Sequence, residues 1–216
     1  MNVDVLLYDG FDELDGIGPY EVFDYAIGYA AEEAADATDD ADDSDAGRVR
    51  YVTLEERETV TASHGTRVGI DGVLPDPTDG DAPDLLVVPG GGWNARDEEA
   101  SAWAEAQKGA IPAALTDYHE AGVRIATVCT GSMLLAEAGI TDGRRAVTHA
   151  GAIDELRESG ADVVDARVVD DGDLLTAGGI TSGLDLALYI VEREFGGAIA
   201  DRVATVTEYE RRYEIA

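Results

Sequence analysis

Short apolar runs alternate with longer segments whose apolar residues recur at helical spacing. The runs are strand-sized and rich in β-branched residues, as buried strands are. We expect strands at 3–8, 48–54, 66–70, 85–88 and 123–128. A helix with Pro19 near its first turn follows the first strand, which places Asp15 near the end of the preceding loop. Further helices are expected at 98–121 (broken near Gly109 or Pro112), 132–138, 153–158, 184–195 and 199–206.

This alternation predicts a mostly parallel sheet with helices on both faces. The later apolar runs at 163–164, 167–169 and 174–177 suggest a β-ribbon or strands near a sheet edge. A chain of 216 residues fits one domain with a substantial core. We therefore predict a single α/β domain over residues 1–216, a flavodoxin-like three-layer sandwich with a nucleophile elbow.

One segment interrupts the pattern. Residues 32–45 contain eight acids in fourteen positions and nothing able to anchor a core. We expect a solvated acidic insert over about 32–46, with disorder as one option, and assign it no function.

The charge excludes one class of partner. A formal net charge of −31, from 46 acids against 15 bases, argues against binding nucleic acid, which needs a basic footprint. It favours a halophilic source in which salt screens the acidic surface. An acidic face that recruits a cationic partner is the alternative, without a local pattern to support it.

The expected location is cytoplasmic. The single cysteine cannot form an internal disulfide, and the N-terminus has neither a basic region nor a long apolar one. No apolar run approaches the length of a membrane span, so we expect no membrane association. The end of the chain at Ala216 leads us to expect no fused DNA-binding domain.

The candidate chemistry centres on Cys129, the only cysteine. A β-branched strand delivers it into the turn Thr130-Gly131 before a helical pattern resumes, which is the sequence form of a nucleophile elbow. An inert buried thiol is the usual fate of a lone cysteine. Here the Thr130 N–H and the following helix would favour the thiolate, and a second N–H from Gly91 could complete an oxyanion hole.

Two other polar segments should join this cysteine. The loop with Asp15, the loop 90–92 and Cys129 each follow a strand directly, and the carboxyl ends of parallel strands share one rim. A carboxyl group brought near the thiol would have its pKa raised, toward a protonated form that donates a hydrogen bond to sulfur.

Four segments together resemble the ThiJ/PfpI superfamily, of class I glutamine amidotransferase-like fold. They are Leu14-Asp15-Gly16-Ile17-Gly18-Pro19-Tyr20-Glu21-Val22-Phe23, Val88-Pro89-Gly90-Gly91-Gly92, Val128-Cys129-Thr130-Gly131 and Thr148-His149. The resemblance covers nearly the whole chain except the acidic insert. The acid before Pro19 together with Cys-Thr-Gly is most similar to the isonitrile hydratase branch and to the ligand domains of some transcription regulators.

The resemblance implies roles for five residues. Cys129 would be the nucleophile and Asp15 the acid that contacts its sulfur, while Gly91 and Thr130 would supply the oxyanion-hole N–H groups. His149 matches a histidine whose role varies between branches; a structural histidine at a loop or dimer boundary is the alternative. Peptidase-like members often have histidine after the cysteine, so Thr130 argues against a Cys-His dyad.

These residues predict a cofactor-independent cysteine hydratase or hydrolase on a small electrophilic molecule, with isonitrile hydration to an N-substituted formamide as the most specific hypothesis. Glyoxalase or deglycase chemistry on methylglyoxal, and a redox or ligand sensor without turnover, remain alternatives. We expect no metal, because three scattered histidines and one cysteine lack a zinc spacing. The resemblance also implies a homodimer.

Overall fold

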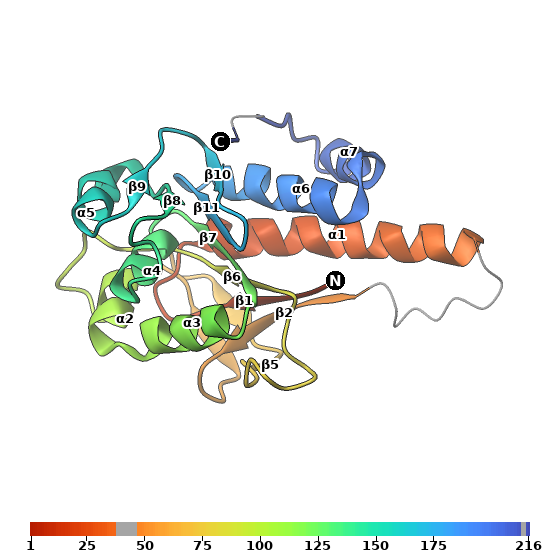
Figure 1. Ribbon diagram of the computed structural model, residues 1–216. Coiled ribbons are helices and arrows are strands. Elements are labelled where there is room, and N and C mark those ends of the chain that lie inside the picture. Colours follow the sequence, from red (N-terminus) through yellow and green to blue (C-terminus); the bar gives the residue numbers. More distant parts are fainter. Residues whose placement is uncertain (38–46, 213–214) are drawn as a thin grey trace.

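A seven-stranded sheet forms the centre of the molecule, in the order β10-β11-β7-β6-β1-β2-β5. The computed structural model describes residues 1–37, 47–212 and 215–216 (Figure 1). All neighbouring strands are parallel except β10 and β11. The strands of this sheet are β1 (Asn2–Leu6), β2 (Arg48–Thr53), β5 (Gly72–Val73), β6 (Leu85–Val88), β7 (Arg124–Val128), β10 (Val168–Asp170) and β11 (Leu174–Ala177).

Helices cover both faces of the sheet, and this explains why its central strands are mostly apolar and buried. Every residue of β6 and β11 is buried. One face carries α1, α6 and α7, and α2, α3 and α4 lie on the other (Figure 1). The helices are α1 (Glu13–Ala37), α2 (Ala102–Lys108), α3 (Ala110–Glu120), α4 (Gly131–Glu137), α5 (Ile153–Glu158), α6 (Ser182–Phe195) and α7 (Gly197–Val206). No helix in the described ranges is long and apolar enough to cross a membrane.

The predicted α/β sandwich with a mostly parallel sheet is confirmed. Three very short strands were not predicted, because two or three residues are too few to show an alternating pattern. They are β3 (Thr59–Thr61), β5 and β8 (Arg145–Ala146). β3 forms a hairpin with β4 (Arg67–Gly69), which lies within the strand expected at 66–70, and β8 pairs with β9 (Asp162–Val163), which overlaps the apolar run 163–164.

The first helix differs from the prediction at both ends. It begins at Glu13, so Asp15 lies in its first turn and Pro19 lies inside it. Pro19 lies close to Gly183 of α6, where an added Cβ would be 3.5 Å from the Pro19 Cγ. The helix also continues through residues 32–37, which we expected in the acidic loop; the rest of that insert, 38–46, lies outside the described residues.

The predicted break in the helical segment 98–121 occurs at Gly109. This residue has φ of 77°, the left-handed conformation that glycine adopts readily, and it separates α2 from α3. Residues 98–101 are not helical, because the Ser101 side chain caps α2 by accepting a hydrogen bond from the N–H of Ala104.

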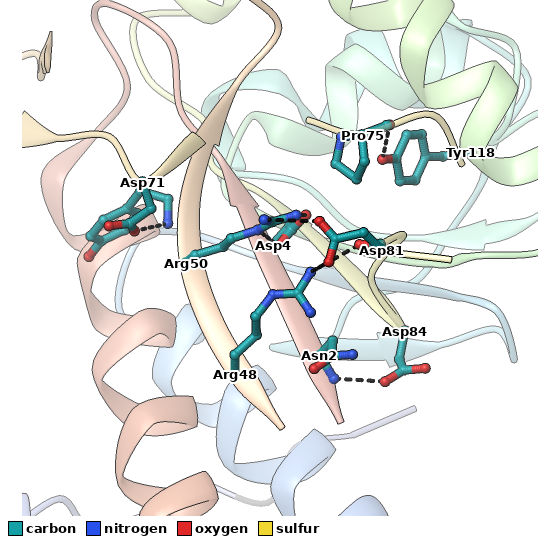
Figure 2. A network of polar contacts seen from close by, with 10 residues as sticks. Asn2, Asp4, Arg48, Arg50, Asp71, Pro75, Asp81, Asp84 and Tyr118 are labelled. Carbon is teal, nitrogen blue, oxygen red and sulfur yellow. Dashed lines mark hydrogen bonds and ion pairs between the residues drawn. The ribbon is translucent and has the colours of Figure 1, made fainter. Parts of the chain in front are cut away.

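A buried ion pair joins β1 to β2 (Figure 2). Asp4 is fully buried and lies opposite Arg50 in the strand register. The Arg50 guanidinium donates hydrogen bonds to both Asp4 carboxylate oxygens, at 2.7 and 3.0 Å. Arg50 also pairs with Asp81 at 3.3 Å. The two-point geometry compensates for taking the Asp4 charge out of water.

Candidate active site

Cys129 lies at the turn between β7 and α4 with φ of 57°, one of only two positive values among the described non-glycine residues. Left-handed backbone at a non-glycine residue costs energy and persists only where the surroundings hold it. Here the N–H of Cys129 donates to the carbonyl of Gly178 at 2.9 Å, and its carbonyl accepts from the Thr148 hydroxyl at 2.9 Å. The turn is therefore a nucleophile elbow fastened on both sides.

Two glycines let the neighbouring loop approach this elbow. A Cβ on Gly90 would lie 2.4 Å from the Thr130 nitrogen, and one on Gly131 would lie 2.3 Å from the Val88 carbonyl oxygen. Real side chains do not tolerate such distances, so glycine is required at both positions. The close packing brings the loop after β6 against the start of α4.

Asp15 reaches the same point from the first turn of α1. Its side chain is fully buried, and Oδ2 accepts a hydrogen bond from the N–H of Gly90 at 3.1 Å. Oδ1 has no hydrogen-bond partner among the described residues. The Cys129 thiol lies close enough to this carboxyl group to lower its pKa. Asp15 therefore lies against the sulfur on one side and the glycine loop on the other.

Burial dominates the electrostatics of both groups. Burial first and the charge of Asp12 second raise the pKa of Asp15, Gly90 and Cys129 lower it, and the net result is a pKa of about 8. Burial also raises the pKa of the Cys129 thiol to about 12, followed by the negative charge of Asp15. A neutral Asp15 removes that second cause, whereas burial continues to raise the pKa of the thiol.

Backbone N–H groups oppose part of this rise in the pKa of Cys129 without cancelling it. Those of Ile180, in the loop after β11, and Thr130, at the start of α4, hydrogen-bond the sulfur and lower the pKa of Cys129. The N–H of Gly91 points elsewhere: it donates to the Thr130 hydroxyl oxygen at 3.0 Å. The two predicted oxyanion-hole residues are thus joined by a hydrogen bond, and Gly91 could serve an oxyanion only if that bond moved.

His149 lies at the rim of this region. Its Nδ1 accepts a hydrogen bond from the N–H of Gly151 at 3.0 Å, and its ring faces Gly179, where a Cβ would lie 3.0 Å from Cδ2. No hydrogen bond joins His149 to the Cys129 sulfur within the part of the chain that the structure describes. The neighbouring residue, Thr148, holds the Cys129 carbonyl instead. The described residues also contain no group of three or more potential metal ligands.

Residues 1–193 match the DJ-1/PfpI family, a range that includes the elbow, the glycine loop and the first turn of α1. The chain belongs to the DJ-1/PfpI family. Isonitrile hydratase from Pseudomonas putida is 37% identical over 155 residues, which are 69% of this chain and 61% of that protein. The aligned region thus spans under two thirds of the hydratase. Deglycase PH1704 from Pyrococcus horikoshii is 31% identical over 69% of this chain and 81% of its own length.

Solved structures of DJ-1/PfpI proteins show the same fold. The crystal structure of a ThiJ/PfpI family protein from Pseudomonas syringae superposes with a TM-score of 0.77 at 24% identity, covering 98% of this chain and 76% of that one. At this identity the likeness concerns the fold alone.

Two contributors to this DJ-1/PfpI site were not predicted. Ile180 acts through its backbone N–H, which no side-chain pattern reveals, although the adjacent Gly178-Gly179 pair marks a tight connection at the end of a strand. Asp12 raises the pKa of Asp15 through its charge. Its position three residues before Asp15, in the loop after the first strand, is the available signal.

Proposed function

We propose that this protein hydrates isonitriles to N-substituted formamides, with Cys129 as nucleophile and Asp15 as acid. The single observation that carries the proposal is the fully buried carboxyl group of Asp15 beside the Cys129 thiol, where burial raises the pKa of Asp15 to about 8 and so favours the protonated acid at neutral pH. The terminal carbon of an isonitrile bears a lone pair and becomes strongly electrophilic once it is protonated. A neutral carboxylic acid beside a nucleophile suits that requirement.

In the first step, Asp15 protonates the isonitrile carbon as the Cys129 sulfur attacks it. A C–H bond and a C–S bond form, the C–N triple bond becomes a double bond, and Asp15 takes up the proton released by the thiol. The product is a thioimidate on Cys129, and Asp15 is again protonated.

In the second step, water adds to the thioimidate. Its oxygen bonds to the carbon, and Asp15 relays a proton to the nitrogen. The C–S bond then breaks as the carbonyl forms, and the hydroxyl proton returns to sulfur through Asp15. The sum is one isonitrile and one water consumed and one formamide released, with no oxidation or reduction.

The test is a panel of alkyl and aryl isonitriles incubated with the purified chain in high salt, with formamide measured by mass spectrometry. We expect formamide from at least one member of the panel and none with Cys129→Ala. Absence of product across the panel, or equal turnover by Cys129→Ala, would falsify the proposal. Asp4→Asn is the matched control, since it alters a buried aspartate whose partner is Arg50.

Deglycase or glyoxalase chemistry on methylglyoxal is the second candidate, because the 31% identical relative bears the name deglycase. The same sulfur would add to the aldehyde to form a hemithioacetal. Lactate formed from methylglyoxal by the wild-type chain, absent with Cys129→Ala and exceeding any formamide activity, would favour this alternative.

A further inference from the structure

Asp185 is a buried carboxylate that the proposed chemistry does not use. It lies in the first turn of α6 with its side chain 2% exposed. Three other residues surround it with hydrogen-bond donors. They are Arg167 (Nε at 2.9 Å and Nη2 at 2.7 Å), Tyr209 (hydroxyl at 3.0 Å) and Arg212 (backbone N–H at 2.8 Å). Such a complete set of donors offsets the cost of burying the charge.

These donors come from segments that are far apart in the sequence. Arg167 directly precedes β10, whereas Tyr209 and Arg212 follow α7. Asp185 therefore fastens the C-terminal segment to the start of α6. The last residues add a second attachment at the sheet edge, where the N–H of Ala216 donates to the carbonyl of Val168 at 3.0 Å.

Arg167 continues this network to the loop between β11 and α6. Its carbonyl accepts from the N–H of Gly178 at 2.9 Å, and its Nη2 lies 3.4 Å from the hydroxyl oxygen of Thr181. The same loop touches the nucleophile: the Gly178 carbonyl accepts from the Cys129 N–H at 2.9 Å, and the backbone N–H of Ile180 lowers the pKa of the Cys129 thiol.

We propose that Asp185 is a positioning residue for Cys129, acting through Arg167 on the loop 178–181. When Asp185 holds the Arg167 guanidinium, the loop keeps its carbonyl on the Cys129 N–H and its Ile180 N–H on the sulfur. Loss of that charge frees Arg167 and lets the loop move away from the elbow. The inference rests on the proposed function only in taking Cys129 as the reacting group.

The test compares Asp185→Asn with Asp4→Asn in the full-length chain. Both replace a buried aspartate that is paired with an arginine by its isostere. In the strand register, Asp4 of β1 pairs with Leu86 of β6, which pairs with Ile125 of β7. Asp4 therefore lies two strands away from β7, at a level before the carboxyl end of that strand where Cys129 follows. Asp15 and Asp12, the acids that act on Cys129, are unchanged in both variants.

The first readout is the rate at which iodoacetamide alkylates Cys129, the only thiol, at fixed pH. We expect about a 10-fold slower rate in Asp185→Asn, the size of one lost charge-assisted hydrogen bond, and a rate within about twofold of wild type in Asp4→Asn. The second readout is turnover of the preferred substrate, where kcat should fall about 10-fold with KM nearly unchanged.

An unchanged or faster alkylation rate in Asp185→Asn, or an equal loss in Asp4→Asn, overturns the proposal. Because alkylation needs no substrate, its outcome stands even if no isonitrile is hydrated. Should Asp185→Asn fail to fold, Tyr209→Phe removes one donor to Asp185 and leaves the ion pair with Arg167 in place. It should slow alkylation about twofold to threefold, and an unchanged rate there also counts against the proposal.

Discussion

The Thr130 hydroxyl oxygen accepts a hydrogen bond from the backbone N–H of Gly91 at 3.0 Å, in a place where both residues are buried. This bond joins the elbow to the glycine loop. A hydroxyl that accepts one bond still has its own proton to donate. Thr130 can therefore hold the loop and hydrogen-bond a bound substrate at the same time.

Replacing Thr130 by valine tests this dual role. Valine keeps the shape but leaves the buried Gly91 N–H without a partner, which should cost about 1–3 kcal/mol in the free energy of unfolding. Turnover should fall about 10-fold or more, because both the loop position and the hydroxyl are lost. Guanidinium unfolding and steady-state kinetics measure the two effects. Thr130→Ser, which keeps the hydroxyl, should retain most of both properties; equal losses in the two variants would contradict this role.

The raised pKa of Asp15 predicts how activity depends on pH. The proposed chemistry needs the protonated acid, and that proton is lost as pH rises through about 8. We expect kcat/KM to be steady at neutral pH and to fall above about pH 8. Asp15→Asn should be at least about 100-fold slower at neutral pH, since the amide cannot transfer the proton. A pH–rate profile that instead rises through pH 8 would show that the carboxylate is the active form.

The same shift makes a separate prediction about stability. Folding raises the pKa of Asp15 from 3.8 to about 8. Between these two pH values the folded chain holds a proton that the unfolded chain has released, so the free energy of unfolding falls as pH rises from about 4 to 8. Asp15→Asn removes this penalty. Its free energy of unfolding should exceed that of wild type at pH 8 by roughly 3–5 kcal/mol, and the difference should shrink toward pH 4. Unfolding curves of both proteins across this range give the comparison, in which other titrations cancel.

Much of this arrangement follows from the sequence because it depends on topology. Parallel strands put their carboxyl ends on one rim, so the loops after β1, β6 and β7 were expected to meet, and the structure brings Asp15, Gly91, Thr130 and Cys129 together there. The predicted position of Asp15, in the loop before the helix, was wrong, because Asp15 lies in the first turn of α1. Proline is typical of the first turn of a helix, but Pro19 lies inside α1, which begins at Glu13.

Other features could not be read from the sequence for physical reasons. The Ile180 N–H is a backbone group, and its contact with sulfur depends on the path of a loop. The bond between Gly91 and the Thr130 hydroxyl likewise depends on rotamer and loop position. Residues 32–37 looked too acidic for a core helix, yet they simply extend α1 beyond its buried part. The role of His149 stays a prediction.

The backbone at Cys129 predicts an unusual order of stability. With φ of 57°, alanine at this position keeps the strain, whereas glycine relieves it. Cys129→Gly should therefore be about 1 kcal/mol more stable than Cys129→Ala, the reverse of the order found within helices and strands. Thermal unfolding of both inactive variants measures the difference. If the alanine variant proved the more stable, the elbow would not be strained in solution.

The ion pair between Asp4 and Arg50 offers a test of how this acidic chain tolerates buried charge (Figure 2). Arg50→Leu leaves the fully buried Asp4 carboxylate without its guanidinium partner, and we expect a loss of about 3–5 kcal/mol in the free energy of unfolding. Adding Asp4→Leu removes the stranded charge, and an apolar pair can pack between the strands. The double variant should then recover most of that loss, because the desolvation cost of the two charges disappears with their attraction.

Guanidinium unfolding of the two single variants and the double variant completes the cycle. A double variant as unstable as Arg50→Leu alone would mean that the pair stabilises the sheet beyond the cost of burying it.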